Sequence, residues 1–271
     1  MPATTDLEIT TVMHPLRART LEVLAVEDIG PRYRRVVLGG PELEPDFPFL
    51  ANAATDHVKV LVPDADGGVT VPEIRDDRVV RGEGVFPVAR DYTVRAFDER
   101  GLVVDFVLHD HGLAGRWAGT ARVGDRLGVL GPRGSHRYPQ GYDRYLLVAD
   151  ETALPAVGRW LDAHGTTTGY RSIDVVAVVQ SIDEYPLPNV PGATVHWVLA
   201  PLGAGRADAL AAAVRDRIAP GAFVWAAGES TQLKPLRRLL RQRLERHQYD
   251  VDGYWRAGVV NLDHHESDDE D

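Results

Sequence analysis

The chain has 271 residues, of which 44% are hydrophobic and 26% charged, so it is long enough for two globular domains. Its net charge of −10 argues against nucleic acid or an anionic membrane surface as the main partner. Because the sequence contains no cysteine, disulfides, thiolate metal sites and iron–sulfur clusters are excluded.

The start of the chain lacks the pattern of a leader peptide. Residues 1–15 have neither a basic n-region nor an apolar h-region, and they predict a flexible lead-in. No apolar run approaches the ~18 residues that a membrane helix needs. We therefore expect a soluble cytoplasmic protein with no membrane insertion.

Short stretches of alternating apolar and polar residues predict strands in the first half of the chain. The predicted strands are 20–26, 33–38, 57–62, 92–97, 102–109 and 127–130. A short helix is predicted over 114–121, after Gly112. Because short strands at this spacing are typical of antiparallel barrels, we expect a Greek-key β-barrel domain over residues 16–140.

The pattern changes near residue 141, where strand-like runs alternate with helical stretches. The predicted strands are 145–149, 173–179, 195–199 and 222–226, and apolar residues repeat at helical spacing over 153–161, 210–218 and 233–244. This alternation predicts parallel βαβ units with helices on both sheet faces. We expect an α/β domain over 141–262 and a disordered acidic tail over 263–271.

Arg90-Asp-Tyr-Thr93 begins one of the predicted barrel strands. Side chains alternate across a strand, so Arg90 and Tyr92 share one face. The guanidinium can hold a phosphate oxygen, the ring offers a flat surface, and the Thr93 hydroxyl can bond a ring edge. These residue types suit a flavin nucleotide, although an arginine and a tyrosine in this position are more often solvated.

Further motifs follow in a fixed order along the chain. They are Gly112-Leu-Ala-Gly-Arg-Trp-Ala118, Gly124-Asp-Arg-Leu127, Gly131-Pro-Arg-Gly-Ser135, Asp150-Glu-Thr-Ala-Leu-Pro155, Ala227-Gly-Glu229 and Gly253-Tyr-Trp-Arg256. The ordered set resembles the siderophore-interacting protein family. Members of this family are FAD-containing ferric-siderophore reductases related to the ferredoxin-NADP reductases, and the resemblance spans most of the chain.

The resemblance implies that the first domain binds FAD. The implied contacts are Arg90, Tyr92, Thr93, His109, Gly112, Leu113, Ala114, Trp117 and Ala118. Free amides and the dipole at the helix start after Gly112 favour a pyrophosphate, although the family usually has proline where Leu113 stands. We assign Trp117 to helix packing. His109 and His111 flank Asp110 without an obvious third ligand, so we predict no metal site.

By the same resemblance, the second domain admits NADH or NADPH at the carboxyl ends of its strands. The candidate residues are Thr152, Ala153, Asp183, Gly228 and Glu229. Gly228 would let a nicotinamide approach closely, whereas the acidic pair Asp150–Glu151 discourages tight docking of a pyrophosphate. Asp183 and Glu184 follow the strand where ribose selectivity usually lies. Their charges would repel a 2′-phosphate, which favours NADH.

Three cations are candidates for binding an anionic ferric siderophore, namely Lys59, Arg133 and Arg256. Each alone is more often an ordinary surface charge. The resemblance implies a basic pocket beside the flavin, with the segment 253–256 returning to the flavin's edge. Lys234 is expected on the exposed side of a helix and receives no role.

The leading hypothesis is therefore an FAD-dependent ferric-siderophore reductase that uses NAD(P)H and releases Fe(II) for intracellular use. A second hypothesis keeps the flavin but takes electrons from a reduced ferredoxin. A third is a non-enzymatic siderophore-binding carrier in which the flavin is structural or absent.

Overall fold

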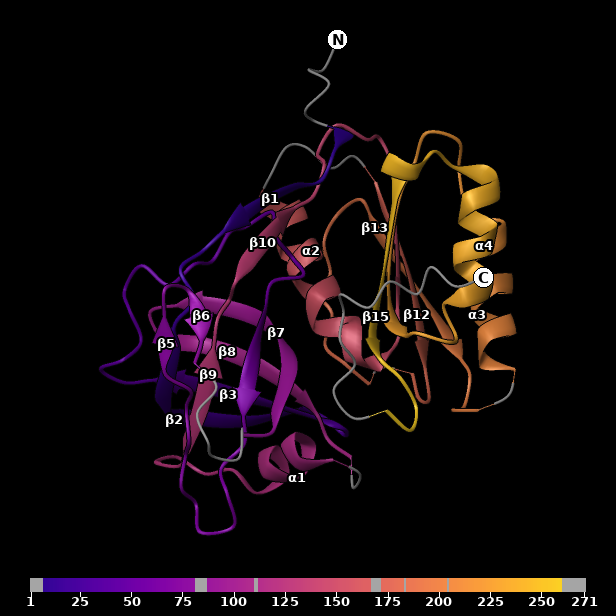
Figure 1. The fold of residues 1–271 in the computed structure, drawn as a ribbon. Helices are drawn as coiled ribbons and strands as arrows, with labels where there is room; N and C mark the ends of the chain where they lie inside the picture. Colours follow the sequence, from indigo (N-terminus) through magenta and orange to yellow (C-terminus); the bar gives the residue numbers. More distant parts are fainter. Residues whose placement is uncertain are drawn as a thin grey trace. The chain divides into compact units, whose positions relative to one another are not determined.

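The computed structural model describes residues 7–80, 87–109, 112–166, 172–182, 184–203 and 205–259. The chain divides into two compact units (Figure 1), here called the barrel unit and the sheet unit. The barrel unit consists of Thr10–Arg137 with the short segment Glu184–Pro186, and the sheet unit holds the remaining described residues. The predicted combination of a β-domain and an α/β domain is confirmed.

An antiparallel barrel forms the core of the barrel unit. Its strands are β2 (Ala18–Gly30), β3 (Tyr33–Gly39), β4 (His57–Leu61), β7 (Ala89–Asp98), β8 (Gly101–Val107) and β9 (Arg126–Leu130), closed in the order β2-β3-β8-β7-β4-β9. Alternate residues such as Val58 and Val60 point inward and are fully buried, as the strand period requires. Helix α1 (Leu113–Thr120) packs Ala114 and Ala118 against the same core.

Short strands outside the barrel were not predicted. β1 (Thr10–Met13) pairs antiparallel with β10 (Gly134–Arg137), and β5 (Ile74–Arg75) pairs with β6 (Arg78–Val79). The expectation of a flexible lead-in is therefore wrong for residues 10–13. The four residues of β1 are too few to give a local signal, and the partner strand lies far along the chain.

The sheet unit contains a parallel five-stranded sheet in the order β13-β12-β11-β14-β15. Its elements are β11 (Tyr145–Ala149), η2 (Glu151–Ala153), α2 (Leu154–Thr166), β12 (Ile173–Val179), β13 (Ala193–Leu199), α3 (Arg206–Arg215), β14 (Phe223–Glu229), α4 (Lys234–Arg243), η3 (Arg246–Gln248) and β15 (Tyr249–Trp255). The predicted βαβ alternation is confirmed. The segment 253–256 lies at the end of β15, which pairs with β14.

Helices cover both faces of this sheet. Helices α3 and α4 lie on one face (Figure 1), where Leu210 of α3 and Leu236 of α4 pack together with Val148. On the other face, Trp160 of α2 packs against Trp225 in a tilted arrangement, with ring centroids 6.5 Å apart. Since neighbouring residues of a strand face opposite sides, the continuous apolar runs of the central strands are explained by burial on both faces.

The segment Glu184–Pro186 follows β12 in sequence but packs within the barrel unit. The Tyr185 hydroxyl donates to Oδ2 of Asp105 at 2.5 Å and accepts from Nε of Arg95 at 3.2 Å. Arg35 donates two further bonds, of 2.7 and 2.8 Å, to the same carboxylate. Burial and the charge of Asp105 raise the pKa of Tyr185, so its hydroxyl remains a donor. A buried polar network therefore anchors this segment.

Replacing Tyr185 by phenylalanine tests this anchor. We expect a loss of about 1.5–3 kcal/mol of stability, because a bond to a buried charged group disappears. Calorimetry should show a lower Tm for the Tyr185→Phe protein. Tyr185→Ala should lower it further, because the edge contact with Tyr33 is lost as well. A Tyr185→Phe protein with the parent's Tm would contradict the anchor.

Candidate functional site

Strand β7 carries the predicted flavin residues Arg90, Tyr92 and Thr93. Tyr92 packs on Phe106, with ring centroids 4.4 Å apart, and burial raises the pKa of its phenol. Arg90 donates from Nη1 to the carbonyl of Ala89 at 2.7 Å, and Thr93 is buried. The strand thus presents a fixed ring, a guanidinium and a hydroxyl within a few residues.

The start of α1 is a cradle built around His109. Gly112 is the N-cap residue, with φ of 119°, no side-chain cap bond and no acidic residue in the first turn. A Cβ at Gly112 would lie 2.9 Å from Cε1 of His109, and one at Gly115 would lie 3.0 Å from Nε2. The imidazole therefore needs both glycines. The uncapped amides of this helix start fit the pyrophosphate of a flavin nucleotide.

The rest of α1 fixes the cradle to the barrel. Trp117 packs on Phe106 at 5.6 Å between ring centroids, as expected for a packing residue, and Ala118 is fully buried. Leu113 and Ala114 open the helix at the cradle. Asp110 and His111 lie outside the described residues. Among the described part of the chain, no cluster of three acidic or imidazole side chains could hold a metal ion.

Two of the three candidate substrate cations, Lys59 and Arg133, belong to the barrel unit, and the part of it that carries them is here called its edge. Lys59 of β4 pairs with Leu130, the last residue of β9. The loop that carries Arg133 follows Leu130 directly. The side chains of Lys59 and Arg133 are 49% and 48% exposed. The third cation, Arg256, belongs to the sheet unit, where it is exposed directly after β15. Lys234, which received no role, is exposed at the start of α4.

Acidic partners at both barrel cations were missed by the sequence analysis. Nζ of Lys59 donates to both carboxylate oxygens of Asp91, at 2.9 and 2.8 Å. The Arg133 guanidinium lies 3.8 Å from Asp77. Asp91 is part of the Arg90–Thr93 motif, but its pairing with Lys59 depends on the register of β4 and β7. The edge is therefore less positive than its cations alone suggest.

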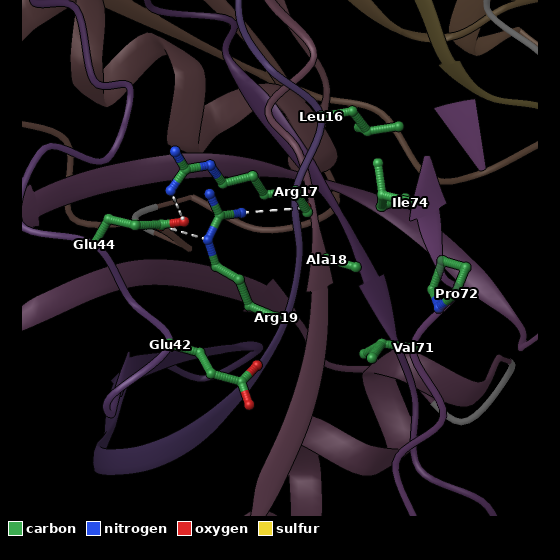
Figure 2. A pocket seen from close by; sticks show the side chains of 9 residues that line it. All are labelled: Leu16, Arg17, Ala18, Arg19, Glu42, Glu44, Val71, Pro72 and Ile74. Carbon is green, nitrogen blue, oxygen red and sulfur yellow. Dashed lines mark hydrogen bonds and ion pairs between the residues drawn. The ribbon is translucent and has the colours of Figure 1, made fainter. Parts of the chain in front are cut away.

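A groove of about 460 Å³ opens beside β2 (Figure 2). Its arginines point toward one carboxylate, with Arg17 and Arg19 lying 2.6 and 2.7 Å from Glu44. Arg19 also donates to the carbonyl of Gly131 at 2.6 Å, which supports the loop before Arg133. Since these charges are paired with each other, we assign the groove no ligand.

Asp150 organises the carboxyl edge of the parallel sheet. Its Oδ1 accepts from the amide and hydroxyl of Thr152, at 2.8 and 2.6 Å. Its Oδ2 accepts from the Glu229 amide at 2.9 Å and from Nε1 of Trp255 at 2.7 Å. A Cβ at Gly228, where φ is 155°, would lie 2.7 Å from this carboxyl group. The space predicted to admit a nicotinamide is thus used by Asp150.

The second member of the acidic pair also turns inward. Glu151 accepts from the Gln180 amide at 3.0 Å and pairs with Nη2 of Arg206 at 2.5 Å. Arg206 also donates to the carbonyl of Val178 at 2.6 Å. Burial, and secondarily the charge of Glu151, raise the pKa of Asp150. The pair is therefore held by structural partners at this edge, where the sequence analysis expected its charges to discourage the docking of a pyrophosphate.

The remaining predicted nucleotide residues have structural partners as well. The Glu229 carboxylate accepts from the hydroxyl of Thr231 at 2.5 Å and from the amides of Gln232 and Ala257, at 2.8 and 3.1 Å. Ala153 is fully buried in η2. These residues hold the loops after β11 and β14 in place.

Of the predicted selectivity pair, the structure describes only Glu184. Glu184 is 0% exposed within the barrel unit and lies 3.1 Å from Nη1 of Arg32, so the expectation that it faces a ribose is wrong. Asp183 lies outside the described residues. The sequence analysis missed Arg206, a buried residue from a distant part of the chain that donates to the carbonyl of Val178 in β12, and no local signal could have revealed it.

Comparisons with known proteins identify both halves of the chain. Residues 22–136 match the siderophore-interacting FAD-binding domain, and residues 142–258 match the siderophore-interacting protein domain. The chain is 34% identical over 257 residues to the NADPH-dependent ferric-chelate reductase of Escherichia coli (strain K12), covering 91% of this chain and 96% of that protein. FAD is therefore the cofactor of the barrel unit.

Two further relatives agree. A ferric vibriobactin reductase of Vibrio cholerae is 28% identical over 261 residues, which cover 92% of this chain and 93% of that protein. The crystal structure of a siderophore utilization protein from T. fusca is 43% identical with a TM-score of 0.85, covering 95% of this chain and all of that chain. Within the described residues, no helix has the length and apolar character needed to cross a membrane.

Two glycines of α1 provide a matched test of the cradle. In Gly115→Ala, the new methyl group must displace the His109 ring, so we expect weaker FAD binding. In Gly119→Ala, the methyl group meets nothing within 4 Å. That variant should bind FAD normally and gain about 0.5–1 kcal/mol of helix stability. Titration of the apoproteins with FAD, followed by flavin fluorescence, measures both affinities. Equal FAD affinities in the two variants would show that the cradle around His109 does not contribute to FAD binding.

Proposed function

The chain belongs to the siderophore-interacting protein family, and from this premise we propose that it is an FAD-dependent reductase of ferric siderophores. Electrons come from NADH or NADPH, and Fe(II) is released. The observation that carries the proposal is that the flavin cradle and two exposed cations belong to the same barrel unit. We assign the flavin to residues 16–140 and the nicotinamide donor to residues 141–262.

When bound, FAD would accept two electrons as a hydride and could pass them on one at a time. In our proposal, the chain's own residues bind the FAD and orient its ring system. Arg90 holds a phosphate oxygen, Tyr92 supports the ring system and Thr93 bonds its edge. The amides at Gly112–Ala114 hold the pyrophosphate, and His109 lines the same cradle.

The nicotinamide donor is proposed to bind at the carboxyl edge of the parallel sheet, where ligands of such sheets dock. Thr152, Ala153, Gly228 and Glu229 form this edge through their contacts around Asp150. A ferredoxin remains the alternative donor, but no described feature favours it. We place the reaction in the cytoplasm, where NADH and NADPH are available.

The substrate is proposed to bind at the edge of the barrel unit that carries Lys59 and Arg133, and Arg256 of the sheet unit stays a separate candidate. Many ferric siderophores are anions, and a net charge of −10 opposes their approach unless cations are concentrated locally. Iron held by hard oxygen donors needs no protein ligand. Reduction to Fe(II) weakens its binding to those donors and releases the metal.

The ion pair between Lys59 and Asp91 tests the proposed substrate site, because removing either charge should change the KM for an anionic substrate in the opposite direction. Lys59→Ala should raise the KM for an anionic ferric catecholate by about two- to fivefold, because a cation is lost and the charge of Asp91 is no longer offset by it. Asp91→Asn should lower it by a similar factor, because Lys59 is released. Both effects should shrink at high salt. A neutral ferric hydroxamate is the control substrate, and equal effects on both substrates would contradict an electrostatic role.

The donor is tested by rapid mixing of the oxidised protein with NADH, NADPH or reduced ferredoxin. We expect a nicotinamide to bleach the flavin. Asp183→Asn should increase the use of NADPH relative to NADH, because a negative charge that opposes a 2′-phosphate is removed. Glu184→Gln is the matched control, and it should lower the Tm without changing the ratio. A colourless parent protein that takes up no FAD would instead favour the carrier.

A further inference from the structure

A row of polar side chains adjoins the loop that carries Arg133. Nε2 of His14 lies 2.8 Å from Oγ of Ser135, and that hydroxyl donates to Oδ2 of Asp56 at 2.8 Å. Ser135 and Asp56 are 0% and 2% exposed, whereas His14 is partly exposed. The three residues come from the segment after β1, from β10 and from the residue before β4. No part of the flavin or nicotinamide site uses them.

The hydrogen bonds determine which imidazole nitrogen carries the proton. Ser135 has a single hydroxyl proton, and it is donated to Asp56. The bond between His14 and Ser135 therefore requires a hydrogen on Nε2. In the neutral imidazole, Nδ1 is then the unprotonated nitrogen, and a further proton is taken up there.

Backbone contacts couple His14 directly to Arg133. The His14 amide donates to the Arg133 carbonyl at 3.0 Å, and Nη1 of Arg133 donates to the His14 carbonyl at 3.1 Å. Charged groups with contacts to this pair among the described residues include Asp56, reached through Ser135, and Asp77, which lies 3.8 Å from the Arg133 guanidinium. A change in the charge of His14 is thus felt where an anion would meet Arg133.

We propose that His14 is a proton-linked substrate-binding residue, whose added positive charge at low pH strengthens the capture of an anionic ferric complex beside Arg133. This inference rests on the proposed function. Partial burial lowers the pKa of His14 from 6.5, so the charge is gained only below that value. The proton comes from solvent, and no bond to iron is formed.

The test measures binding to the oxidised, FAD-loaded protein between pH 5.5 and 8 by quenching of tryptophan fluorescence. The probes are a hexadentate ferric tris-catecholate, which is an anion, and a neutral ferric trihydroxamate. The parent should bind the anion roughly three- to tenfold more tightly at the low-pH end, with the midpoint below 6.5. His14→Gln can still donate to Ser135, and it should keep the weaker affinity throughout. Binding of the neutral complex should not depend on pH.

Ser135→Ala is the second variant, because it keeps His14 but breaks the link to Asp56. Its midpoint should move to lower pH, since the carboxylate no longer favours the imidazolium. If His14→Gln retains the parent's pH dependence, the inference is overturned. If His14→Gln does not fold, an unchanged midpoint in Ser135→Ala overturns it instead.

The same experiment separates this inference from the proposed function. A parent that binds and reduces both complexes, with the pH dependence intact in His14→Gln, overturns the role of His14 alone. A parent that binds neither complex overturns the proposed function as well.

Discussion

Buried carboxylates hold loops in place in both units of the structure. Asp150 accepts bonds from Thr152, Glu229 and Trp255, and so joins the ends of three parallel strands. In the barrel, Asp105 binds Arg35 and Tyr185. Removing one partner of such a buried group leaves an uncompensated polar atom, which costs more than the bond itself contributes. These carboxylates therefore fix backbone positions that apolar packing alone would leave variable.

The same interactions explain how an acidic chain can offer a basic edge. Several of its carboxylates are turned inward and paired, as Glu151 is with Arg206. The cations at the barrel edge are exposed, and each has one acidic neighbour that reduces its field. An anionic substrate would have to compete with those neighbours. Single substitutions should therefore change the local charge at this edge. In our proposal, protonation of His14 adds a further positive charge there at low pH.

Periodicity was sufficient to predict the barrel strands and the βαβ units, because both kinds of element bury regular apolar faces. It missed β1 and β10, whose pairing depends on a partner far along the chain. Arg90, Tyr92 and Thr93 lie on β7 and Gly112 lies at the start of α1, as the sequence analysis expected, and their contacts with FAD stay a prediction. The interpretation of Glu184 was wrong because a local pattern cannot show that a loop packs within the other unit. The pairing of Lys59 with Asp91 likewise requires strand register, which the sequence does not reveal.

The central claim is that electrons leave the flavin for a ferric complex bound at the cationic edge of the barrel. The most direct measurement is anaerobic mixing of the prereduced protein with an anionic ferric catecholate in the presence of an Fe(II)-trapping dye. The account predicts flavin reoxidation coupled to about two Fe(II) per FAD, since the flavin carries two electrons and each Fe(III) takes one. Reoxidation should be slower in a Lys59→Ala, Arg133→Ala double variant at low salt. A flavin that stays reduced with the ferric complex, yet reoxidises promptly when oxygen is admitted, would contradict the account.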